Sequence, residues 1–195
     1  MKKDNTDLSR RLSGSPAGGQ GAVTQGASLR IFLIGFMGCG KTHWGKQLSA
    51  KLHMPFFDLD EKLVEKEGRP IPEIFEEGEE YFRLLEKDVL HLLTENHENF
   101  VMACGGGTPC FYNNIDYMKA KGITVWINCS VDCLHERLVK ERSERPLVKD
   151  FTEEALRSYI IKKGADRKIF YQQAAVILTE DEFSLDTLTQ KIFHS

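Results

Sequence analysis

The sequence predicts an α/β fold, a three-layer sandwich in which helices cover both faces of a five-stranded parallel sheet. Short apolar runs alternate along the chain with longer segments that have helical periodicity, and the first run, in LRIFLIG, stops at a glycine. Strands of a parallel sheet are buried on both faces and are therefore continuous apolar runs. The five expected strands are Arg30–Ile34, Pro55–Phe57, Phe100–Cys104, Thr124–Asn128 and Ala175–Leu178.

The segments between these runs have the character of helices. KTHWGKQLSAKLH follows the first run, and the long charged segment IPEIFEEGEEYFRLLEKDVLHLLTE separates the second run from the third. A charged helical stretch follows the fourth run, and a closing helix pattern follows the fifth. In open sheets of this kind, ligands bind at the carboxyl ends of the strands. Residues that directly follow each apolar run are therefore the first candidates for a site.

The length and composition predict one domain preceded by a tail. The chain has 195 residues, of which 41% are hydrophobic, and this is enough for a single domain with a real core. Residues 1–28 are rich in Gly and Ser and poor in large apolar groups, so we expect them to be disordered. Residues 29–195 would form the domain.

Charge and cysteine usage exclude several classes of protein. A net charge of -3 argues against broad binding to nucleic acid or to membranes, because both need a basic field. No apolar run approaches the roughly 20 residues of a membrane span, and the first residues lack the apolar segment of a secretory signal. The five cysteines include no Cys-x-x-Cys pair, which argues against a zinc site. We expect a cytoplasmic monomer with reduced thiols.

The stretch GFMGCGKT, residues 35–42, predicts a phosphate-binding loop. It matches G-x-x-x-x-G-K-[ST], and it lies between an expected strand and an expected helix, which is the context that supports this motif. Backbone N–H groups of such a loop point at phosphate oxygens, and the helix N-terminus adds its positive dipole end. Lys41 would reach the β- and γ-phosphates, and Thr42 would bind Mg²⁺. The expected nucleotide contacts are Gly38, Cys39, Gly40, Lys41, Thr42 and His43. We therefore expect the chain to bind a nucleoside triphosphate such as ATP with Mg²⁺.

Two carboxylates, Asp58 and Asp60, follow the second apolar run in MPFFDLDEK. Side chains alternate along a strand, so the two acids are expected on one face, with Leu59 on the other. Their mutual repulsion would be relieved by a divalent cation. Either carboxylate could help to hold Mg²⁺ near the phosphate-binding loop.

An arginine and a glutamate in EEYFRLLEKD share a helix face. Arg83 and Glu86 are three residues apart, so Glu86 could hold the Arg83 guanidinium while the latter grips an anion. The alternative is a solvated surface pair that contributes little to stability, and spacing alone favours this alternative.

Three further features give weaker signals when each is considered alone. Gly105, Gly106 and Gly107 follow the third run and permit close approach of a ligand or unusual dihedral angles; a flexible turn is the alternative. KERSERPLVKD concentrates basic residues before a proline, and Arg145 could stabilise a transferring phosphoryl group, although a solvated loop fits equally well. Arg167 lies in a helix before the last run and could clamp a carboxylate together with Arg83.

Together these elements closely resemble the shikimate kinase family. The matching pieces are GFMGCGKT, DLD, IPEIFEEGEEYFRLLE, GGG, RPL and RKIFY, in the family's order, and they extend over nearly all of the chain after the tail. The resemblance implies a nucleoside-monophosphate-kinase-like fold. It also implies transfer of a phosphoryl group from ATP to the 3-hydroxyl of shikimate, a step toward chorismate and the aromatic amino acids. It further implies a substrate-binding lobe at about 58–92 and a lid at about 138–151.

The resemblance also implies roles for individual residues. Asp58 matches the family's aspartate near Mg²⁺, and Asp60 matches the aspartate that contacts the acceptor hydroxyls, as a base or only as an orienting group. Arg83 and Arg167 match the arginines that bind the substrate carboxylate, and Glu86 matches the glutamate that supports Arg83.

The glycine run and the lid acquire roles in the same way. Gly105, Gly106 and Gly107 match the glycine run beside the substrate, and Arg145 matches the lid arginine, which is also expected to contact the nucleotide. The catalytic residues would be Lys41, Asp60 and Arg145.

Three questions stay open at this stage. The family has an arginine that packs on adenine, and its counterpart here is Arg137, Lys140 or Arg142. A kinase for another small hydroxylated acid, such as gluconate, also fits the two arginines. A non-catalytic domain that binds ATP as a switch is the third reading, and the intact set of expected catalytic residues argues against it.

Overall fold

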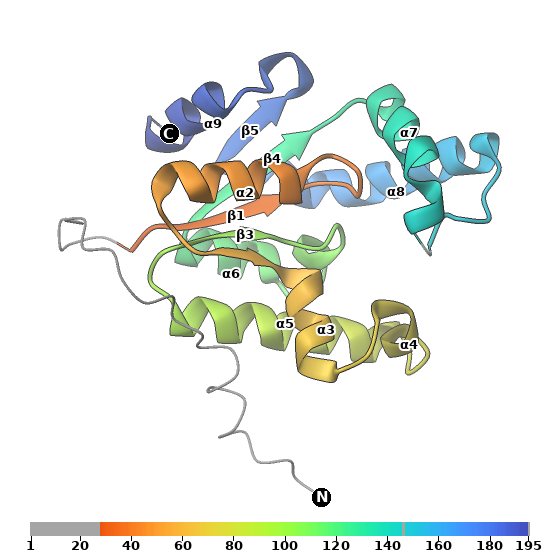
Figure 1. Cartoon of the computed structure of the whole chain (residues 1–195), viewed down its shortest axis with the longest axis horizontal. Coiled ribbons are helices and arrows are strands. Elements are labelled where there is room, and N and C mark those ends of the chain that lie inside the picture. Colours follow the sequence, from red (N-terminus) through yellow and green to blue (C-terminus); the bar gives the residue numbers. More distant parts are fainter. Residues whose placement is uncertain (1–27, 146, 195) are drawn as a thin grey trace, which may run out of the picture.

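The computed structural model of the chain describes residues 28–145 and 147–194. Within them, five parallel strands form one sheet in the order β2-β3-β1-β4-β5, as the sequence predicts for the fold class (Figure 1). The strands are β1 (Arg30–Ile34), β2 (Phe56–Asp58), β3 (Phe100–Ala103), β4 (Ile123–Asn128) and β5 (Val176–Thr179). Each expected strand is confirmed, with no boundary displaced by more than one residue. The predicted tail, residues 1–28, lies outside the described residues except for Ser28.

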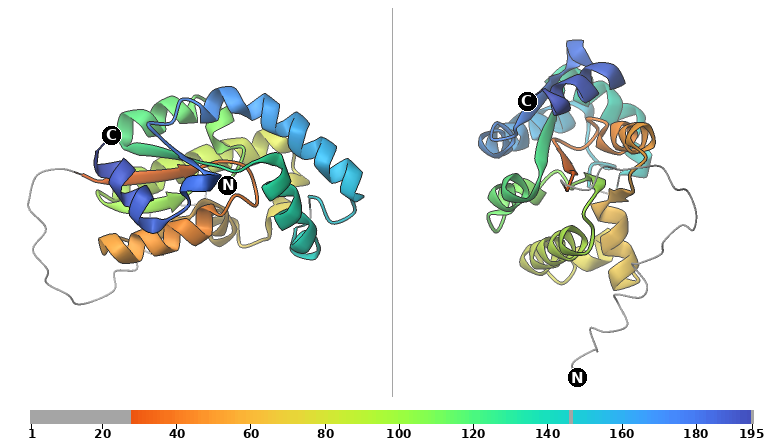
Figure 2. Two further views of the ribbon diagram at one scale, coloured as in Figure 1. Left: turned by 90° about the horizontal axis from the view of Figure 1, so that it is seen from above. Right: turned by 90° about the vertical axis from the view of Figure 1, so that its left-hand side faces the viewer.

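Helices cover both faces of the sheet (Figures 1 and 2). One face carries α2 (Lys41–Leu52) and α9 (Leu185–Phe193), and the other carries α5 (Glu79–Asn96) and α6 (Asn114–Lys121). Near the carboxyl ends of the strands lie α3 (Leu59–Glu67), α4 (Ile71–Phe75), α7 (Val131–Lys140) and α8 (Glu153–Tyr171). The short 3₁₀ turns are η1 (Thr108–Cys110), η2 (Arg142–Glu144) and η3 (Glu180–Glu182). None of the helices within the described residues is long and apolar enough to cross a bilayer.

The core consists of two apolar clusters, one on each side of the sheet. In β1, Phe32 and Ile34 face the cluster under α5, whereas Ile31 and Leu33 face the cluster under α2. All four side chains are fully buried. The continuous apolar run of β1 therefore follows from burial on both faces, because each successive side chain enters a different cluster.

The strand order places the candidate site. The chain passes from β1 to the edge strand β2 and returns to β3, whereas β4 and β5 lie on the other side of β1. The order thus reverses at β1, and ligands of open α/β sheets bind at such a switch point, beyond the carboxyl ends of the strands. GFMGCGKT follows β1, Asp58 ends β2 with Asp60 two residues further on in α3, and the glycine run follows β3. Three stretches far apart in sequence therefore meet at one edge of the sheet.

A pair of glycine substitutions tests the packing of this scaffold. A methyl group at Gly122, between α6 and β4, would overlap with the backbone carbonyl oxygen of Arg30, which cannot rotate away. A methyl group at Gly164, inside α8, would meet no atom within 4 Å. We expect Gly122→Ala to lower the free energy of unfolding by about 2 kcal/mol. Gly164→Ala should raise it by about 0.5–1 kcal/mol, because alanine is the better helix former.

Urea unfolding followed by circular dichroism measures both changes. Equal effects of the two substitutions would contradict the close approach of α6 to β1 that the structure describes.

Candidate active site

The phosphate-binding loop has the predicted strand–loop–helix context. It leaves β1 at Gly35 and enters α2 at Lys41, with Gly40 in a left-handed conformation (φ 99°) at the start of the helix. Glycine adopts this conformation without a steric penalty. The Lys41 ammonium donates to the carbonyl oxygens of Gly35 and Phe36, at 2.9 Å each. Among the described residues no carboxylate forms an ion pair with Lys41, so its charge is available to an anion.

A cavity of about 270 Å³ opens over this loop. Six members of its wall are the loop and helix residues Met37, Gly38, Gly40, Lys41, Thr42 and His43. Asp58, Asp60 and Arg145 face them from other elements. Of the expected nucleotide contacts, Cys39 does not line the cavity; its side chain is fully buried beneath the loop.

The two aspartates are brought together, but not by strand alternation. β2 ends at Asp58, which caps α3: its Oδ1 accepts a hydrogen bond from the backbone N–H of Asp60 at 3.1 Å. Asp60 therefore lies in the first turn of a helix. The alternation argument was wrong because the chain changes conformation between the two acids. Both nevertheless line the cavity over the phosphate-binding loop.

Asp58 also contacts the phosphate-binding loop. Its Oδ2 accepts a hydrogen bond from the Thr42 hydroxyl at 2.7 Å. Two hard oxygen donors thus meet beside the cavity, and oxygen donors of this kind suit Mg²⁺, which takes one or two carboxylates and completes its shell with phosphate oxygens and water. Thr42 and Asp58 fit the ion that the sequence predicts.

The environment of Asp60 raises the pKa of its carboxyl to about 6. The largest cause is desolvation, because protein surrounds the group on most sides although its surface remains open to the cavity. The negative charges of Asp58 and Glu86 raise the pKa further, and the positive charges of Lys41 and Arg83 lower it. Since the pKa of the folded state lies above the ordinary value of 3.8, the folded protein binds this proton more tightly. Stability from this group is therefore lost as the pH rises from about 4 through 6.

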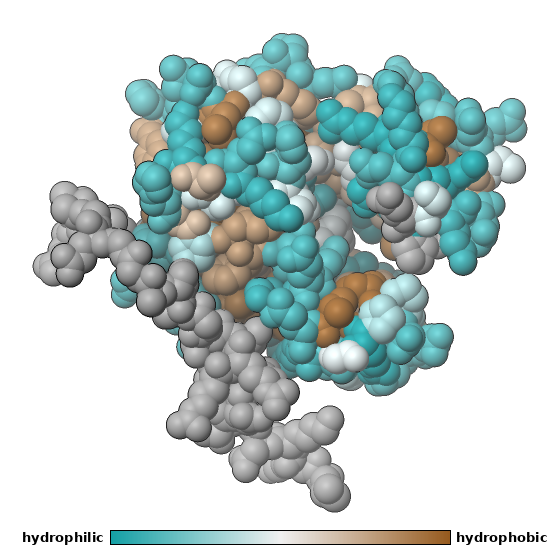
Figure 3. All heavy atoms as spheres, viewed as in Figure 1, coloured by the Kyte–Doolittle hydropathy of each residue, from teal (hydrophilic) through white to brown (hydrophobic). Residues whose placement is uncertain are grey.

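A second cavity, of about 460 Å³, adjoins the first. Its wall combines apolar groups with charged ones: Ile71, Pro72, Phe75, Phe82 and Leu147 with Arg83, Glu86, Arg145 and Arg167. In Figure 3 the surface is hollowed between the part that carries α3 and α4 and the part that carries α7. Met37, Asp60, Gly105, Gly106 and Arg145 line both cavities. The junction between them is therefore the place where a group could pass from one ligand to another.

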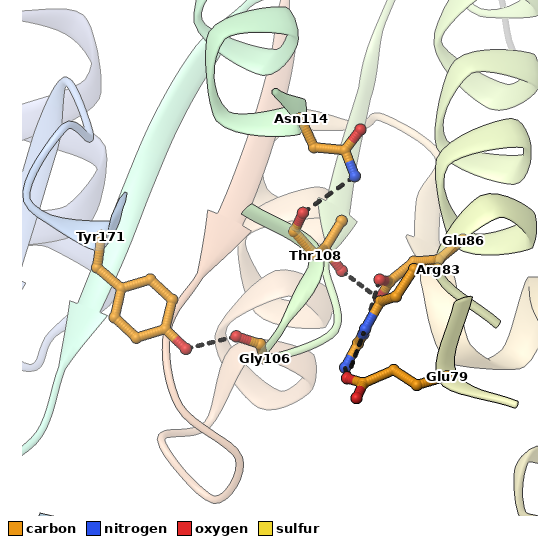
Figure 4. A network of polar contacts seen from close by, with 7 residues as sticks. All are labelled: Glu79, Arg83, Glu86, Gly106, Thr108, Asn114 and Tyr171. Atoms are coloured by element: carbon orange, nitrogen blue, oxygen red, sulfur yellow. Dashed lines mark hydrogen bonds and ion pairs between the residues drawn. The ribbon is translucent and has the colours of Figure 1, made fainter. Parts of the chain in front are cut away.

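Arg83 and Glu86 form a buried pair rather than the solvated one that spacing favours. Only 9% of the Arg83 side chain and 1% of the Glu86 side chain are exposed, and Nη1 of the arginine donates to Oε2 at 2.8 Å. Oε1 of Glu86 accepts a second hydrogen bond, from the Thr108 hydroxyl at 2.6 Å (Figure 4). Glu79 makes a longer contact with Arg83, at 3.4 Å. The two carboxylates hold the guanidinium in place, and the residue also lines the second cavity.

Aromatic rings complete the setting of Arg83. Its guanidinium carbon lies 4.5 Å from the ring centroid of Phe111 and 4.9 Å from that of Phe82. Phe82 stacks in turn on Phe75, with centroids 4.1 Å apart. Cation–π contacts of this kind stabilise a partly desolvated charge, so the guanidinium is restricted to one orientation.

Each glycine of the run leaves room for a different functional side chain. A methyl group at Gly105 would lie 2.6 Å from Oε1 of Glu86, and one at Gly107 would lie 2.7 Å from Nη2 of Arg83. A methyl group at Gly106 would lie 3.1 Å from Nη1 of Arg167. None of the three has a positive φ. The run is therefore explained by close approach of side chains, and not by unusual dihedral angles.

Arg167 lines the second cavity from α8, whereas Arg83 lines it from α5. It lies on α8, as predicted, and its guanidinium carbon is 5.6 Å from the ring centroid of Phe36. Within the described part of the chain it forms no ion pair with a carboxylate. Two cationic groups with planar hydrogen-bond donors thus face one cavity, an arrangement that suits a carboxylate ligand.

The predicted lid carries Arg145 into the site. Its Nη2 lies 2.5 Å from Oε2 of Glu141, and its side chain lines both cavities.

The three candidates for adenine packing have other contacts. Arg137 donates to the carbonyl oxygens of Gly38 and Cys39, at 3.3 and 3.2 Å. Arg142 donates to the Phe151 carbonyl oxygen, and Lys140 pairs with Glu136. The choice among them stays open.

Sequence reasoning missed, among others, three residues that support the site without lining either cavity: Thr108, Phe111 and Tyr171. Tyr171 donates its hydroxyl to the carbonyl oxygen of Gly106 at 2.5 Å. Its position four residues after Arg167, on the same helix face, could have indicated it. No spacing could have indicated Thr108, because its partner Glu86 is 22 residues away.

A phosphate-binding loop, an adjoining cavity with two arginines and the carboxylate of Asp60 at the junction define a P-loop kinase that acts on a small anionic acceptor. The family model described as "Shikimate kinase" matches residues 37–195. The chain belongs to the shikimate kinase family, and the resemblance found in the sequence is confirmed.

Individual relatives agree with this assignment. The chain is 42% identical over 155 residues to a shikimate kinase of Bacteroides thetaiotaomicron, an alignment that covers 79% of this chain and 88% of the relative. It is 38% identical over 164 residues to one of Azobacteroides pseudotrichonymphae, covering 84% and 96%.

Solved structures give the same result. A crystal structure of the shikimate kinase from Bacteroides thetaiotaomicron superposes with a TM-score of 0.79 at 36% identity, covering 86% of this chain and 99% of the other. The shikimate kinase from Acinetobacter baumannii in complex with shikimate superposes with a TM-score of 0.71 at 33% identity, covering 85% and 91%.

Proposed function

We propose that the chain transfers the γ-phosphoryl group of ATP to the 3-hydroxyl of shikimate, giving shikimate 3-phosphate and ADP. One observation carries the proposal. The cavity over the phosphate-binding loop and the cavity with Arg83 and Arg167 meet at Asp60 and Arg145. A donor and an acceptor can therefore lie end to end, with a carboxylate and a guanidinium group at the point of transfer. The reaction is a step in the synthesis of chorismate and the aromatic amino acids.

The nucleotide would lie over the phosphate-binding loop. Backbone N–H groups of the loop and the N-terminus of α2 would bind the phosphate oxygens, and Lys41 would leave its carbonyl contacts to reach the β- and γ-phosphates. Thr42 and Asp58, already in contact at 2.7 Å, would hold Mg²⁺. That ion, when bound, neutralises charge on the phosphates.

Shikimate would lie in the second cavity. Its carboxylate would pair with Arg83 and Arg167, and its ring would lie against the apolar wall that includes Ile71 and Phe75. The two guanidinium groups approach from α5 and α8, so they restrict rotation of the ring as well as its position. Binding is thereby converted into alignment of the hydroxyl with the phosphoryl group, which accelerates a transfer reaction.

Asp60 and Arg145 would act at the junction. Asp60 would accept a hydrogen bond from the attacking hydroxyl and orient it, and its pKa of about 6 leaves it mostly ionised at neutral pH. Arg145 would donate to the γ-phosphoryl oxygens and stabilise the charge that develops on them. We also propose that residues 138–151 act as a lid, because Arg145 and Leu147 of this segment line the cavities. Closure would exclude water and limit hydrolysis of ATP.

The proposal includes the setting in which the enzyme works. All the groups that we assign to the two ligands come from one chain, which supports a monomer. ATP as phosphoryl donor supports a place in the cytoplasm.

An assay of ADP release tests the proposed function. The purified protein is given ATP and Mg²⁺ with shikimate, with gluconate or without an acceptor. We expect ADP release with shikimate, at least about a hundredfold slower release with the other two, and loss of activity when EDTA removes Mg²⁺. Release with gluconate alone would indicate a different kinase, and binding of ATP without release under any condition would indicate a non-catalytic domain.

A single substitution at the junction separates stability from turnover. Asp60→Asn keeps the shape of the side chain but removes a negative charge that is partly desolvated and lies near the charges of Asp58 and Glu86. In metal-free protein at pH 7 we expect the melting temperature to rise by about 1–3 °C, since cavity water screens much of the effect, and the increase should vanish below pH 4. The kcat for shikimate should fall at least about a hundredfold, with the Kd for ATP changed less than about twofold. Turnover at the rate of the unsubstituted protein would remove Asp60 from the chemistry.

A further inference from the structure

Two hydroxyl groups, of residues that line neither cavity of the site, connect the glycine run and the residue after it to the helices on either side. We call Gly105–Gly107 the glycine strap. Tyr171 on α8 donates to the carbonyl oxygen of Gly106 at 2.5 Å. Thr108, the residue after the strap, donates to Glu86 on α5 at 2.6 Å. Figure 4 shows Tyr171 of α8 reaching Gly106 on one side of the strap, whereas the hydroxyl of Thr108, which belongs to η1, points toward Glu86 of α5 on the other side.

Tyr171 is well placed to hold the strap against the helix of Arg167. Only 2% of the residue is exposed, and its ring lies 5.8 Å from that of Trp126, so the hydroxyl has little freedom. It lies one helical turn after Arg167, whose guanidinium passes close to Gly106. Burial raises the pKa of Tyr171 well above its usual range, so the hydroxyl keeps the proton that it donates. A shift of the Gly106 carbonyl would therefore change the space available to Arg167.

Thr108 orients the carboxylate of Glu86, which in turn holds Arg83. The residue is fully buried, and its own carbonyl oxygen accepts a hydrogen bond from the Asn114 side chain at 3.0 Å. Its hydroxyl donates a hydrogen bond to Oε1 of Glu86, and Oε2 of the same carboxylate accepts from Arg83. The carboxylate is thus held at both oxygens, and the guanidinium follows its orientation.

We propose that Tyr171 and Thr108 are positioning residues that set the separation of Arg83 and Arg167 through the glycine strap. Neither touches the substrate; each acts through a neighbour that does. The inference rests on the proposed function, because it assigns the two arginines to the carboxylate of shikimate. It predicts that the strap, and not either helix alone, determines how well the two guanidinium groups match one carboxylate.

Steady-state kinetics and calorimetry test this inference on two variants. Tyr171→Phe and Thr108→Val each remove one hydroxyl and keep the size of the side chain. Loss of one buried hydrogen bond corresponds to roughly a tenfold change in an equilibrium constant, and a bond to a charged group to more. We expect both the KM and the Kd for shikimate to rise about tenfold for Tyr171→Phe and somewhat more for Thr108→Val. The Kd for ATP should change less than about twofold.

Matched substitutions elsewhere provide the controls. Tyr117→Phe removes a tyrosine hydroxyl that contacts Glu95 at the surface, and Thr94→Val removes a buried threonine hydroxyl that contacts the Leu90 carbonyl oxygen. Neither should change the Kd for shikimate, although Thr94→Val should lower the melting temperature. Thr108→Ser keeps the hydroxyl and should behave as the unsubstituted protein does.

The outcomes separate this inference from the proposed function. If the unsubstituted protein does not phosphorylate shikimate, both fail. If it does, and Tyr171→Phe and Thr108→Val lower the melting temperature but leave the Kd for shikimate unchanged, the roles are only structural and the inference is wrong. Loss of affinity in Thr108→Ser equal to that in Thr108→Val would also contradict it.

A double variant tests whether the two hydroxyls act on one strap. Residues that act on a shared element give non-additive effects, whereas independent ones give losses that multiply. We expect the loss of affinity in the combined variant to be smaller than the product of the two single losses. A loss equal to that product would overturn the shared strap.

Discussion

The site depends on one buried charge, the carboxylate of Glu86. A carboxylate with 1% of its side chain exposed persists only if its oxygens are satisfied, because an uncompensated buried charge is strongly destabilising. One oxygen accepts from Arg83 and the other from Thr108, so α5 and the segment after β3 are held together at one point. The guanidinium of Arg83 is thereby held in one orientation and can still bind an anion in the second cavity. Its neighbours, the glycine strap and the aromatic rings, follow from the need to build this pair inside the protein.

The glycine strap provides the space that the pair of Arg83 and Glu86 needs. Side chains at these three positions would occupy the space of Glu86, Arg83 and Arg167, so the absence of side chains is what lets two helices bring their arginines to one cavity. The same bare backbone forms part of the wall between the two cavities through Gly105 and Gly106. One short segment therefore serves the acceptor clamp and the junction at which transfer is proposed.

Features that depend on local sequence could be predicted, and features that depend on distant partners could not. The strand–loop–helix context of GFMGCGKT and the parallel sheet follow from a motif and from apolar runs, and both are confirmed. The spacing of Arg83 and Glu86 favoured a solvated pair, because nothing local reveals that Thr108 lies against the carboxylate. Asp58 and Asp60 were brought to one cavity for a reason other than the one expected, since Asp58 ends the strand and caps the next helix. The roles of these residues came from the family resemblance, and periodicity could not have supplied them.

The affinity of Glu86→Gln for shikimate tests the central claim most directly. Glutamine keeps the shape and can still accept from Thr108, but it removes the charge that holds Arg83. Calorimetry with shikimate and with ATP should show at least a tenfold rise in the Kd for shikimate and little change for ATP. Glu79→Gln is the matched control, because its contact with Arg83 is longer and more exposed, and it should change the Kd for shikimate by no more than about twofold. An unchanged Kd for shikimate in folded Glu86→Gln would contradict the account, because the clamp would then not depend on the buried carboxylate.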